Sequence, residues 1–340
     1  MKKSLAILCV LLAALPSLSC RKKGEGSGGE DVKAGKFTIL GTKTDNANFS
    51  DAKANAENAL LMHPDLNAMV GLYGYNAPKC LEALKDADNR GTKALGKVKV
   101  FGFDGEPPTL EGLKAGSIEG TVVQQPFEFG YQSMKTLKAL HDGQPVPSRD
   151  GIIDIPVKII TRETAAAYEK QVNDVLAAAR SVPAGAAAGP VFAFISNNQS
   201  SFWEAARAGC YKAQTELGIQ VDFQMPAQQE ASEQNRIIES LLVKGECKGI
   251  AISVMSPDSQ GDLLKQVADK MPLITHDSDA PKSARKVYLG TNNYEAGREL
   301  GNFMRQRMPE GGKIMIFVGS VDALNASERL RGLKEALSAP

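Results

Sequence analysis

The sequence predicts an α/β protein of two Rossmann-like lobes, each with a parallel sheet, joined by a hinge. Short apolar, β-rich runs alternate with spacers of helical length along most of the 340 residues, which is the pattern of βα units. An Ala/Gly/Pro-rich stretch near residues 163–189 interrupts this alternation, which then restarts. With 43% hydrophobic and 23% charged residues, the composition is that of a globular chain long enough for two domains.

The first lobe is expected over residues 37–162. Its strand runs are "FTILG" (37–41), "NAMVGLY" (67–73), "KVKVFGF" (97–103) and "IEGTVV" (118–123). A helical pattern follows each run, the last from about residue 126 to 140. "GIIDIPVKII" (151–160) predicts one or two closing strands, because Pro156 interrupts the run.

The second lobe is expected over residues 190–340, after a linker at 163–189. The linker starts with a helical pattern and ends in "SVPAGAAAGP", whose composition is typical of a flexible connection. "VFAFI" (191–195) then opens a second series of alternating strands and helices, which ends in a helix near residues 326–337. The lobes are therefore expected to be two consecutive segments of similar length.

Residues 1–20 have the layout of a lipoprotein signal peptide. Lys2 and Lys3 precede the apolar run "LAILCVLLAAL", and small residues lead to Cys20, as in a lipobox. Residues 21–36 are rich in Gly, Ser and charged residues, which predicts a flexible tether to a lipid anchor. The alternative is a cleaved secretory signal that leaves Cys20 free.

Several function classes lack support in the composition and motifs. A formal net charge of +1 without a basic block argues against nucleic acid. No complete phosphate-loop, dinucleotide or nucleophile-elbow pattern is present, so neither a cofactor nor enzymatic activity is expected. The histidines lack metal-ligand spacing, and Cys80, Cys210 and Cys247 form no CxxC pair, so no metal site is expected.

Polar and aromatic residues follow the predicted strands, which is where open α/β sheets bind their ligands. Amide, carboxylate and guanidinium groups can pair with vicinal hydroxyls, and an aromatic ring can stack on the apolar face of a sugar. The residue types at these positions therefore predict a sugar site. The candidates are Tyr73, Asn76, Asp104 and Gln124 in the first half, and Asn197, Asn198, Phe202, Trp203, Asp277, Asp279, Asn325 and Arg329 in the second.

Several of these segments resemble the periplasmic sugar-binding proteins of the ribose/galactose/glucose type. "HPDLNAMVGLYGYNAPKCLEALK" (63–85) and "VKVFGFDGEPPTLEGLKAGSIEGTVVQQP" (98–126) are similar to the second half of that family. "ISNNQSSFWEAARAGCYKAQTELG" (195–218), "MPLITHDSDA" (271–280) and "ASERLRGLKEAL" (326–337) are similar to its first half. The resemblance implies a periplasmic binding protein type I fold that is circularly permuted, as in the permuted glucose/galactose-binding lipoproteins, with the linker joining the ancestral ends.

The resemblance also implies roles for individual residues. Asp104 corresponds to a carboxylate that accepts two sugar hydroxyls, Gln124 to a later hydrogen-bonding residue, and Arg329 to a guanidinium that binds a sugar oxygen. Asp277 and Asn325 match polar ligand contacts, and Asn76 lies near a family asparagine position that Tyr73 fills here. Trp203, with Phe202 beside it, is expected to be a stacking platform exposed in a polar turn, opposite Tyr73 or Phe49. Ser278 and Asp279 follow Asp277 where ribose-type proteins carry an arginine, which argues against ribose.

The function implied by the resemblance is sugar transport without catalysis. A monomeric, periplasmic, lipid-anchored receptor would close on D-glucose or D-galactose and deliver it to the membrane subunits of an ABC importer. The alternatives are a receptor of the same fold that signals, for example in chemotaxis, a receptor for ribose or xylose, and an extracytoplasmic sugar enzyme.

Overall fold

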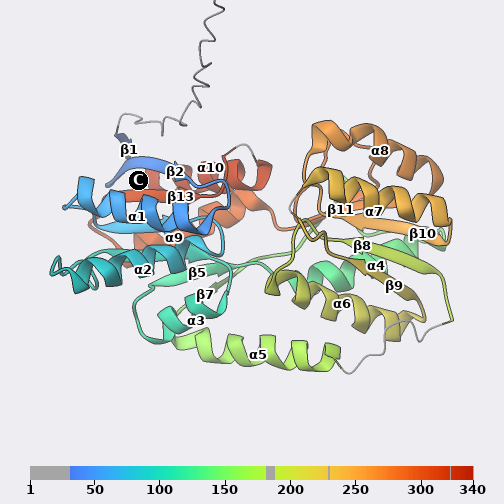
Figure 1. Ribbon diagram of the computed structural model, residues 1–340, viewed down its shortest axis with the longest axis horizontal. Helices are drawn as coiled ribbons and strands as arrows, with labels where there is room; N and C mark the ends of the chain where they lie inside the picture. The colour runs from blue at the N-terminus through green and yellow to red at the C-terminus, as the bar shows by residue number, and fades with distance from the viewer. Residues whose placement is uncertain (1–30, 181–187, 229, 322, 340) are drawn as a thin grey trace, which may run out of the picture.

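The computed structural model describes residues 31–339 except 181–187, 229 and 322, and it has two lobes side by side (Figure 1). The sheet of the first lobe has the strand order β1-β2-β13-β3-β4-β5-β7. Its strands are β1 (Val32–Ala34), β2 (Phe37–Thr44), β3 (Ala68–Gly71), β4 (Lys99–Phe103), β5 (Gly120–Val123), β7 (Lys158–Ile160) and β13 (Gly312–Val318). The pairs β1–β2 and β5–β7 are antiparallel, and the other neighbours are parallel.

Helices cover both faces of this first sheet. One core lies between the sheet and α1 (Phe49–Met62), α2 (Asn76–Asn89) and α3 (Pro107–Lys114). The opposite core lies between the sheet and α9 (Asn293–Arg307) and α10 (Leu324–Ser338). The strands are accordingly apolar on both sides, as in β3, where every residue is buried.

The second lobe has the strand order β6-β12-β11-β10-β8-β9, and all of its strand pairs are parallel. The strands are β6 (Ile152–Asp154), β8 (Val191–Ile195), β9 (Gln220–Gln224), β10 (Cys247–Ile252), β11 (Leu273–His276) and β12 (Val287–Gly290). One face is covered by α4 (Pro126–His141) and α6 (Ser201–Leu217), and the other by α7 (Ala231–Lys244) and α8 (Pro257–Lys270). The predicted α/β class with two largely parallel sheets is confirmed.

Within the described residues, the chain passes between the lobes at three short connections. These are residues 124–125 between β5 and α4, 155–157 between β6 and β7, and 291–292 between β12 and α9. They are held to neighbouring backbone, since the Gln125 side chain donates to the Pro156 carbonyl at 2.6 Å and the Ile155 amide donates to the Gly290 carbonyl at 2.8 Å. Short parallel connections of this kind form a hinge.

The expected lobe boundaries are wrong, because neither lobe is one continuous segment. α4 and β6, from the first half of the chain, complete the second lobe, whereas α9, β13 and α10, from the second half, complete the first. Periodicity in a sequence identifies strands and helices, but long-range pairing decides which sheet each strand joins.

The helical part of the predicted linker is a long helix, α5 (Arg162–Arg180), which runs beneath both lobes (Figure 1). It packs against α3 of the first lobe and α6 of the second. The glycine- and alanine-rich remainder at 181–187 lies outside the described residues. The helix within the predicted linker therefore contacts both lobes.

Candidate functional site

A cleft of about 630 Å³ opens between the lobes at the carboxyl ends of their parallel strands. Ten of the twelve predicted site residues line it, although they come from both lobes and from distant parts of the sequence. They are Tyr73, Asp104, Gln124, Asn197, Asn198, Phe202, Trp203, Asp277, Asn325 and Arg329. Phe49, the alternative stacking residue, lines it as well.

Asp104 lies directly after β4, and its backbone has a φ of 58°. This left-handed conformation turns the chain at the end of the strand. The carboxylate of Asp104 accepts hydrogen bonds from the Gln124 backbone amide and from Gln124 Nε2, each at 3.2 Å. Burial raises the pKa of Asp104, against the attraction of Arg329 and the bonds from Gln124. A partly desolvated acceptor therefore faces the cleft from the first lobe.

Asp277 occupies the equivalent position in the second lobe, directly after β11, and has a φ of 56°. Its Oδ2 accepts from Ser253 Oγ at 2.8 Å and from Asn197 Nδ2 at 3.3 Å. Burial raises the pKa of Asp277 to about 6, while Arg329 and these hydrogen bonds oppose the rise and the charge of Asp104 adds to it. Two carboxylates from different lobes thus face one cleft.

Arg329 brings a buried positive charge to the same cleft. The residue is 2% exposed on α10, and its guanidinium donates to Asn293 Oδ1 at 2.8 Å and to the Leu72 carbonyl at 3.0 Å. The guanidinium carbon lies 4.5 Å from the centre of the Phe103 ring, a cation–π arrangement. These contacts fix the guanidinium where it attracts both Asp104 and Asp277.

Aromatic rings stand on both walls of the cleft. On the first lobe, the rings of Phe49 and Tyr75 are 4.9 Å apart, and Phe49 is 57% exposed. Tyr73 lies beside them and donates its hydroxyl to Asn325 Oδ1 at 3.3 Å. On the second lobe, Phe202 is partly exposed, and its ring is 4.9 Å from that of Trp203.

Trp203 differs from the expected exposed platform, because it is only 2% exposed. Its indole packs near Phe194 and His276, and its Nε1 donates to Asn197 Oδ1 at 3.1 Å. Because Trp203 lies in the first turn of α6, its side chain points into the core of the second lobe. Its main contribution to the cleft is the hydrogen bond that holds the Asn197 side chain in place. Phe202 is the more accessible ring of the pair.

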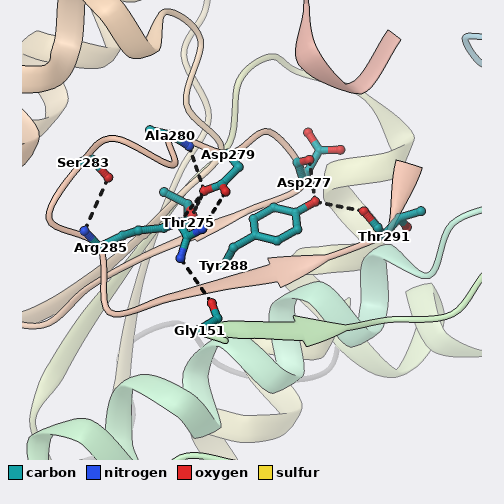
Figure 2. Close-up of polar contacts among 9 residues, drawn as sticks. All are labelled: Gly151, Thr275, Asp277, Asp279, Ala280, Ser283, Arg285, Tyr288 and Thr291. Carbon is teal, nitrogen blue, oxygen red and sulfur yellow. Dashed lines mark hydrogen bonds and ion pairs between the residues drawn. The ribbon is translucent and has the colours of Figure 1, made fainter. Parts of the chain in front are cut away.

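Asp279 does not line the cleft. Figure 2 shows its carboxylate paired with Arg285. Its carboxylate forms a two-point ion pair with Arg285, at 2.6 Å to Nε and 2.8 Å to Nη2, and also accepts from the Ala280 amide at 2.7 Å. Arg285 in turn donates to the Gly151 carbonyl at 3.1 Å. Asp279 therefore closes the loop after β11, while its neighbour Asp277 faces the cleft.

Asn76 also lies behind the cleft wall and not on it. The residue is 1% exposed, donates to Asp45 Oδ2 at 3.0 Å and accepts from the Tyr73 amide at 3.0 Å. Asp45 accepts from the Tyr75 hydroxyl at 2.5 Å as well, and burial raises its pKa. Asp45 and Asn76 thus support the loop that presents Tyr73 and Tyr75.

Two features of the site were missed from the sequence. Glu106 lines the cleft, and burial raises its pKa, with a further contribution from the charge of Asp104. Its position two residues after Asp104 in "FDGEPP" was the available signal. Asp45 directly follows β2, so the strand-end rule that identified Asp104 and Asp277 also applied to it.

Among the residues that the structure describes, no group of three or more His, Cys, Asp and Glu side chains could hold a metal ion. Cys80, Cys210 and Cys247 are free and buried, and burial raises the pKa of each thiol. No helix within the described ranges is both long and apolar enough to cross a bilayer.

Comparison with known sequences gives a family match over most of the chain. A family model described as "Periplasmic binding protein domain" matches residues 22–145 and 192–340. The ribose import binding protein RbsB of Escherichia coli is 26% identical over 147 residues, which is 43% of this chain and 46% of that protein. RbsB of Bacillus subtilis is 26% identical over 152 residues, or 45% and 46% of the two chains. The chain therefore matches about half the length of these relatives.

Solved structures give matches of similar extent. A solute-binding protein of an ABC transporter from Burkholderia graminis, in complex with D-arabinose, is 32% identical and covers 43% of this chain and 51% of that one, with a TM-score of 0.41. The glucose-galactose binding protein GanP from Geobacillus stearothermophilus is 28% identical, with coverages of 34% and 39% and a TM-score of 0.31.

Proposed function

Because the chain belongs to the periplasmic binding protein domain family, we propose that it is a receptor that binds a hexose, D-glucose or D-galactose, between its lobes. The observation that carries this proposal is the pair Asp104 and Asp277, one from each lobe, which face one cleft with Arg329. Carboxylates and a guanidinium form charge-assisted hydrogen bonds with hydroxyls and ring oxygens. A ligand held by both lobes stabilises the closed arrangement, because only that arrangement offers both sets of contacts.

The aromatic walls support a sugar over other polar ligands. Phe202 on the second lobe and Phe49 and Tyr75 on the first can contact the apolar faces of a pyranose ring, while the acids bind hydroxyls at its edge. Asn197, Asn198 and Asn325 add amides that can both donate and accept. Of the twelve predicted ligand contacts, the proposal keeps the ten residues that line the cleft and leaves out Asn76 and Asp279. Trp203 contributes mainly by holding the Asn197 side chain in place.

Calorimetric titration with D-glucose, D-galactose, D-ribose, D-xylose and D-arabinose tests this proposal. We expect a hexose to bind with a dissociation constant in about the micromolar range, equal to roughly −8 kcal/mol, and pentoses to bind at least tenfold more weakly. Ribose is the main competitor, because the curated relatives are ribose import proteins. Tighter binding of ribose than of either hexose would contradict the hexose assignment, and no binding of any sugar would contradict the function.

The affinity is expected to fall in acid because of Asp277. Burial raises the pKa of this carboxyl to about 6, and donation from sugar hydroxyls favours its ionised form. Below about pH 6 the Asp277 carboxyl is largely protonated, so the sugar can bind only as this proton leaves. The affinity for sugar therefore falls by up to about tenfold for each further pH unit. Titrations at about pH 7.5, 6 and 5 measure the effect. Asp277→Asn should bind weakly at all three values with a shallower slope, since Asp104 still titrates in the cleft. A wild-type affinity that is flat or rises in acid would contradict the mechanism.

We also infer that the chain is circularly permuted relative to other members of its family. The segments that resemble the family's second half precede those that resemble its first half. The contact between the new ends supports the inference, since an ideal Cβ on Gly35 would lie 2.6 Å from the Leu337 carbonyl oxygen. α10 could thus continue directly into β1 and β2, beside which it lies (Figure 1).

The proposed setting is the periplasm, with a monomeric receptor that delivers sugar to ABC permease subunits in the membrane. Membership of a periplasmic binding protein family supports this location. The lipid anchor at Cys20 remains a proposal from the sequence, because that residue lies outside the described residues. A signalling partner is the alternative to a permease, and an enzyme is the least favoured reading.

A further inference from the structure

A second cavity of about 190 Å³ lies next to the cleft, between α5 and the two lobes. Asp104, Glu106, Gln124, Ser201 and Phe202 line both cavities, so the two spaces meet at these residues. Ser201 Oγ and Glu106 Oε2, from opposite lobes, lie 3.5 Å apart at this boundary. We call the second cavity the α5 chamber. Its walls come from α3, α5 and α6.

The wall of the α5 chamber is largely apolar. Leu110 of α3, Ala205 and Phe202 of α6, and Val172 and Leu176 of α5 face it. The carboxylate of Glu169 in the same wall is already paired with Lys114 Nζ, at distances of 3.0 and 2.8 Å, and that of Asp104 is held by Gln124. The chamber therefore suits an apolar group better than a second sugar ring.

Tyr168 lines the chamber beside Gly105, whose neighbours Asp104 and Glu106 line both cavities. Its ring packs over Gly105, since an ideal Cβ there would be 2.6 Å from Tyr168 Cε1 and 3.2 Å from the hydroxyl. Among the described residues, no protein group hydrogen-bonds that hydroxyl. The charge of Asp104 acts on it, and burial raises the pKa of Tyr168, so the phenol stays protonated. It can donate to an oxygen that only accepts, which is the chemistry of a glycosidic oxygen.

We propose that the protein accepts glycosides, with the sugar ring in the cleft and an apolar aglycone in the α5 chamber. The inference rests on the proposed sugar function and names the ligand class more narrowly. An apolar protein cavity of about 150 Å³ holds a benzene ring, so the chamber has room for a phenyl group. Burial of that group among Leu110, Val172, Leu176 and Phe202 supplies affinity that a free monosaccharide lacks.

The test compares D-glucose and D-galactose with their methyl and phenyl glycosides, in both anomeric forms, by calorimetry. For the better anomer, the phenyl glycoside should bind at least tenfold more tightly than the methyl glycoside. Val172→Trp fills the chamber and should abolish this preference, while binding of the free hexose changes less than about twofold. Val175→Trp is the matched control, because Val175 lies on the same helix but does not line the chamber.

The outcomes separate the two proposals. If a free hexose binds but its phenyl glycosides bind no better than the methyl glycosides, the chamber proposal is wrong and the sugar function stands. Equal effects of Val172→Trp and Val175→Trp on the preference would also overturn it. If neither free sugars nor glycosides bind, both proposals fail. Should Val172→Trp not fold, Leu176→Gln places a polar amide in the same wall and should reduce the phenyl preference.

Discussion

Asp104→Asn is expected to weaken hexose binding at least a hundredfold without destabilising the free protein. In the proposed site this carboxylate accepts two sugar hydroxyls, and loss of two charge-assisted hydrogen bonds would weaken binding by about 3 kcal/mol or more. Asn tolerates the left-handed backbone at this position, and its carbonyl oxygen can still accept from Gln124. Since burial raises the pKa of Asp104, the ionised group destabilises the fold at neutral pH, and its removal is neutral or stabilising.

Calorimetry and thermal unfolding of the same variant measure both effects. Asp279→Asn is the matched control, because Asp279 follows the other site strand but pairs with Arg285 away from the cleft. It should lower the thermal midpoint and leave the sugar affinity within about threefold. If Asp104→Asn retained near-native affinity, or if Asp279→Asn lost as much affinity, the assignment of the two carboxylates would be wrong.

Arg329→Met is expected to abolish sugar binding and to destabilise the protein by about 3–5 kcal/mol. That is the usual effect of removing one charge from a buried set of opposite charges, because the remaining charges are left uncompensated. The guanidinium holds Asn293 and the Leu72 carbonyl, and it is the buried positive charge that attracts Asp104 and Asp277. At about 2–4 °C per kcal/mol, the thermal midpoint should fall by on the order of 10 °C.

The loss of stability in Arg329→Met should be smaller in acid than at neutral pH. Without the guanidinium, the pKa of Asp104 and of Asp277 rises further above the unfolded value. A group with a raised folded pKa contributes stability that is present below its unfolded pKa and lost as the pH rises through the folded pKa. The variant should therefore lie closer to wild type at about pH 5 than at pH 7.5. Arg331→Met, at an exposed position on the same helix, should change stability by less than about 1 kcal/mol, since it loses only a surface cation–π contact with Tyr294.

The residues placed well from sequence are those whose position follows from strand ends alone. Asp104, Gln124 and Asp277 come directly after β4, β5 and β11, and parallel strands bring such residues to one edge of a sheet. The same rule could not show that Asp277 faces the cleft whereas Asp279, two residues later, does not. Asp279 forms an ion pair with Arg285, which lies six residues further along the chain. Nor could it place Asn76, whose partner Asp45 lies 31 residues away in sequence.

Trp203 shows a different limit of sequence reasoning. A polar turn next to a lone tryptophan indicated an exposed platform, but α6 begins at Ser201, within that turn, and carries the indole into the aromatic cluster with Phe194 and His276. Burial of a large ring depends on which helix face meets the sheet, and that face is set by packing of the whole lobe.

By itself, the sequence determined the α/β class, the alternation of strands and helices, and most of the polar groups at the strand ends. These properties are local, since the periodicity of apolar residues and turn chemistry specify them within a few residues. Only the tertiary structure decided that α4 and β6 belong to the second lobe and that α9, β13 and α10 belong to the first. It also decided that Trp203 is buried and that α5 forms one wall of a chamber beside the cleft. Those outcomes depend on contacts between residues far apart in the chain, whose energies no local pattern encodes.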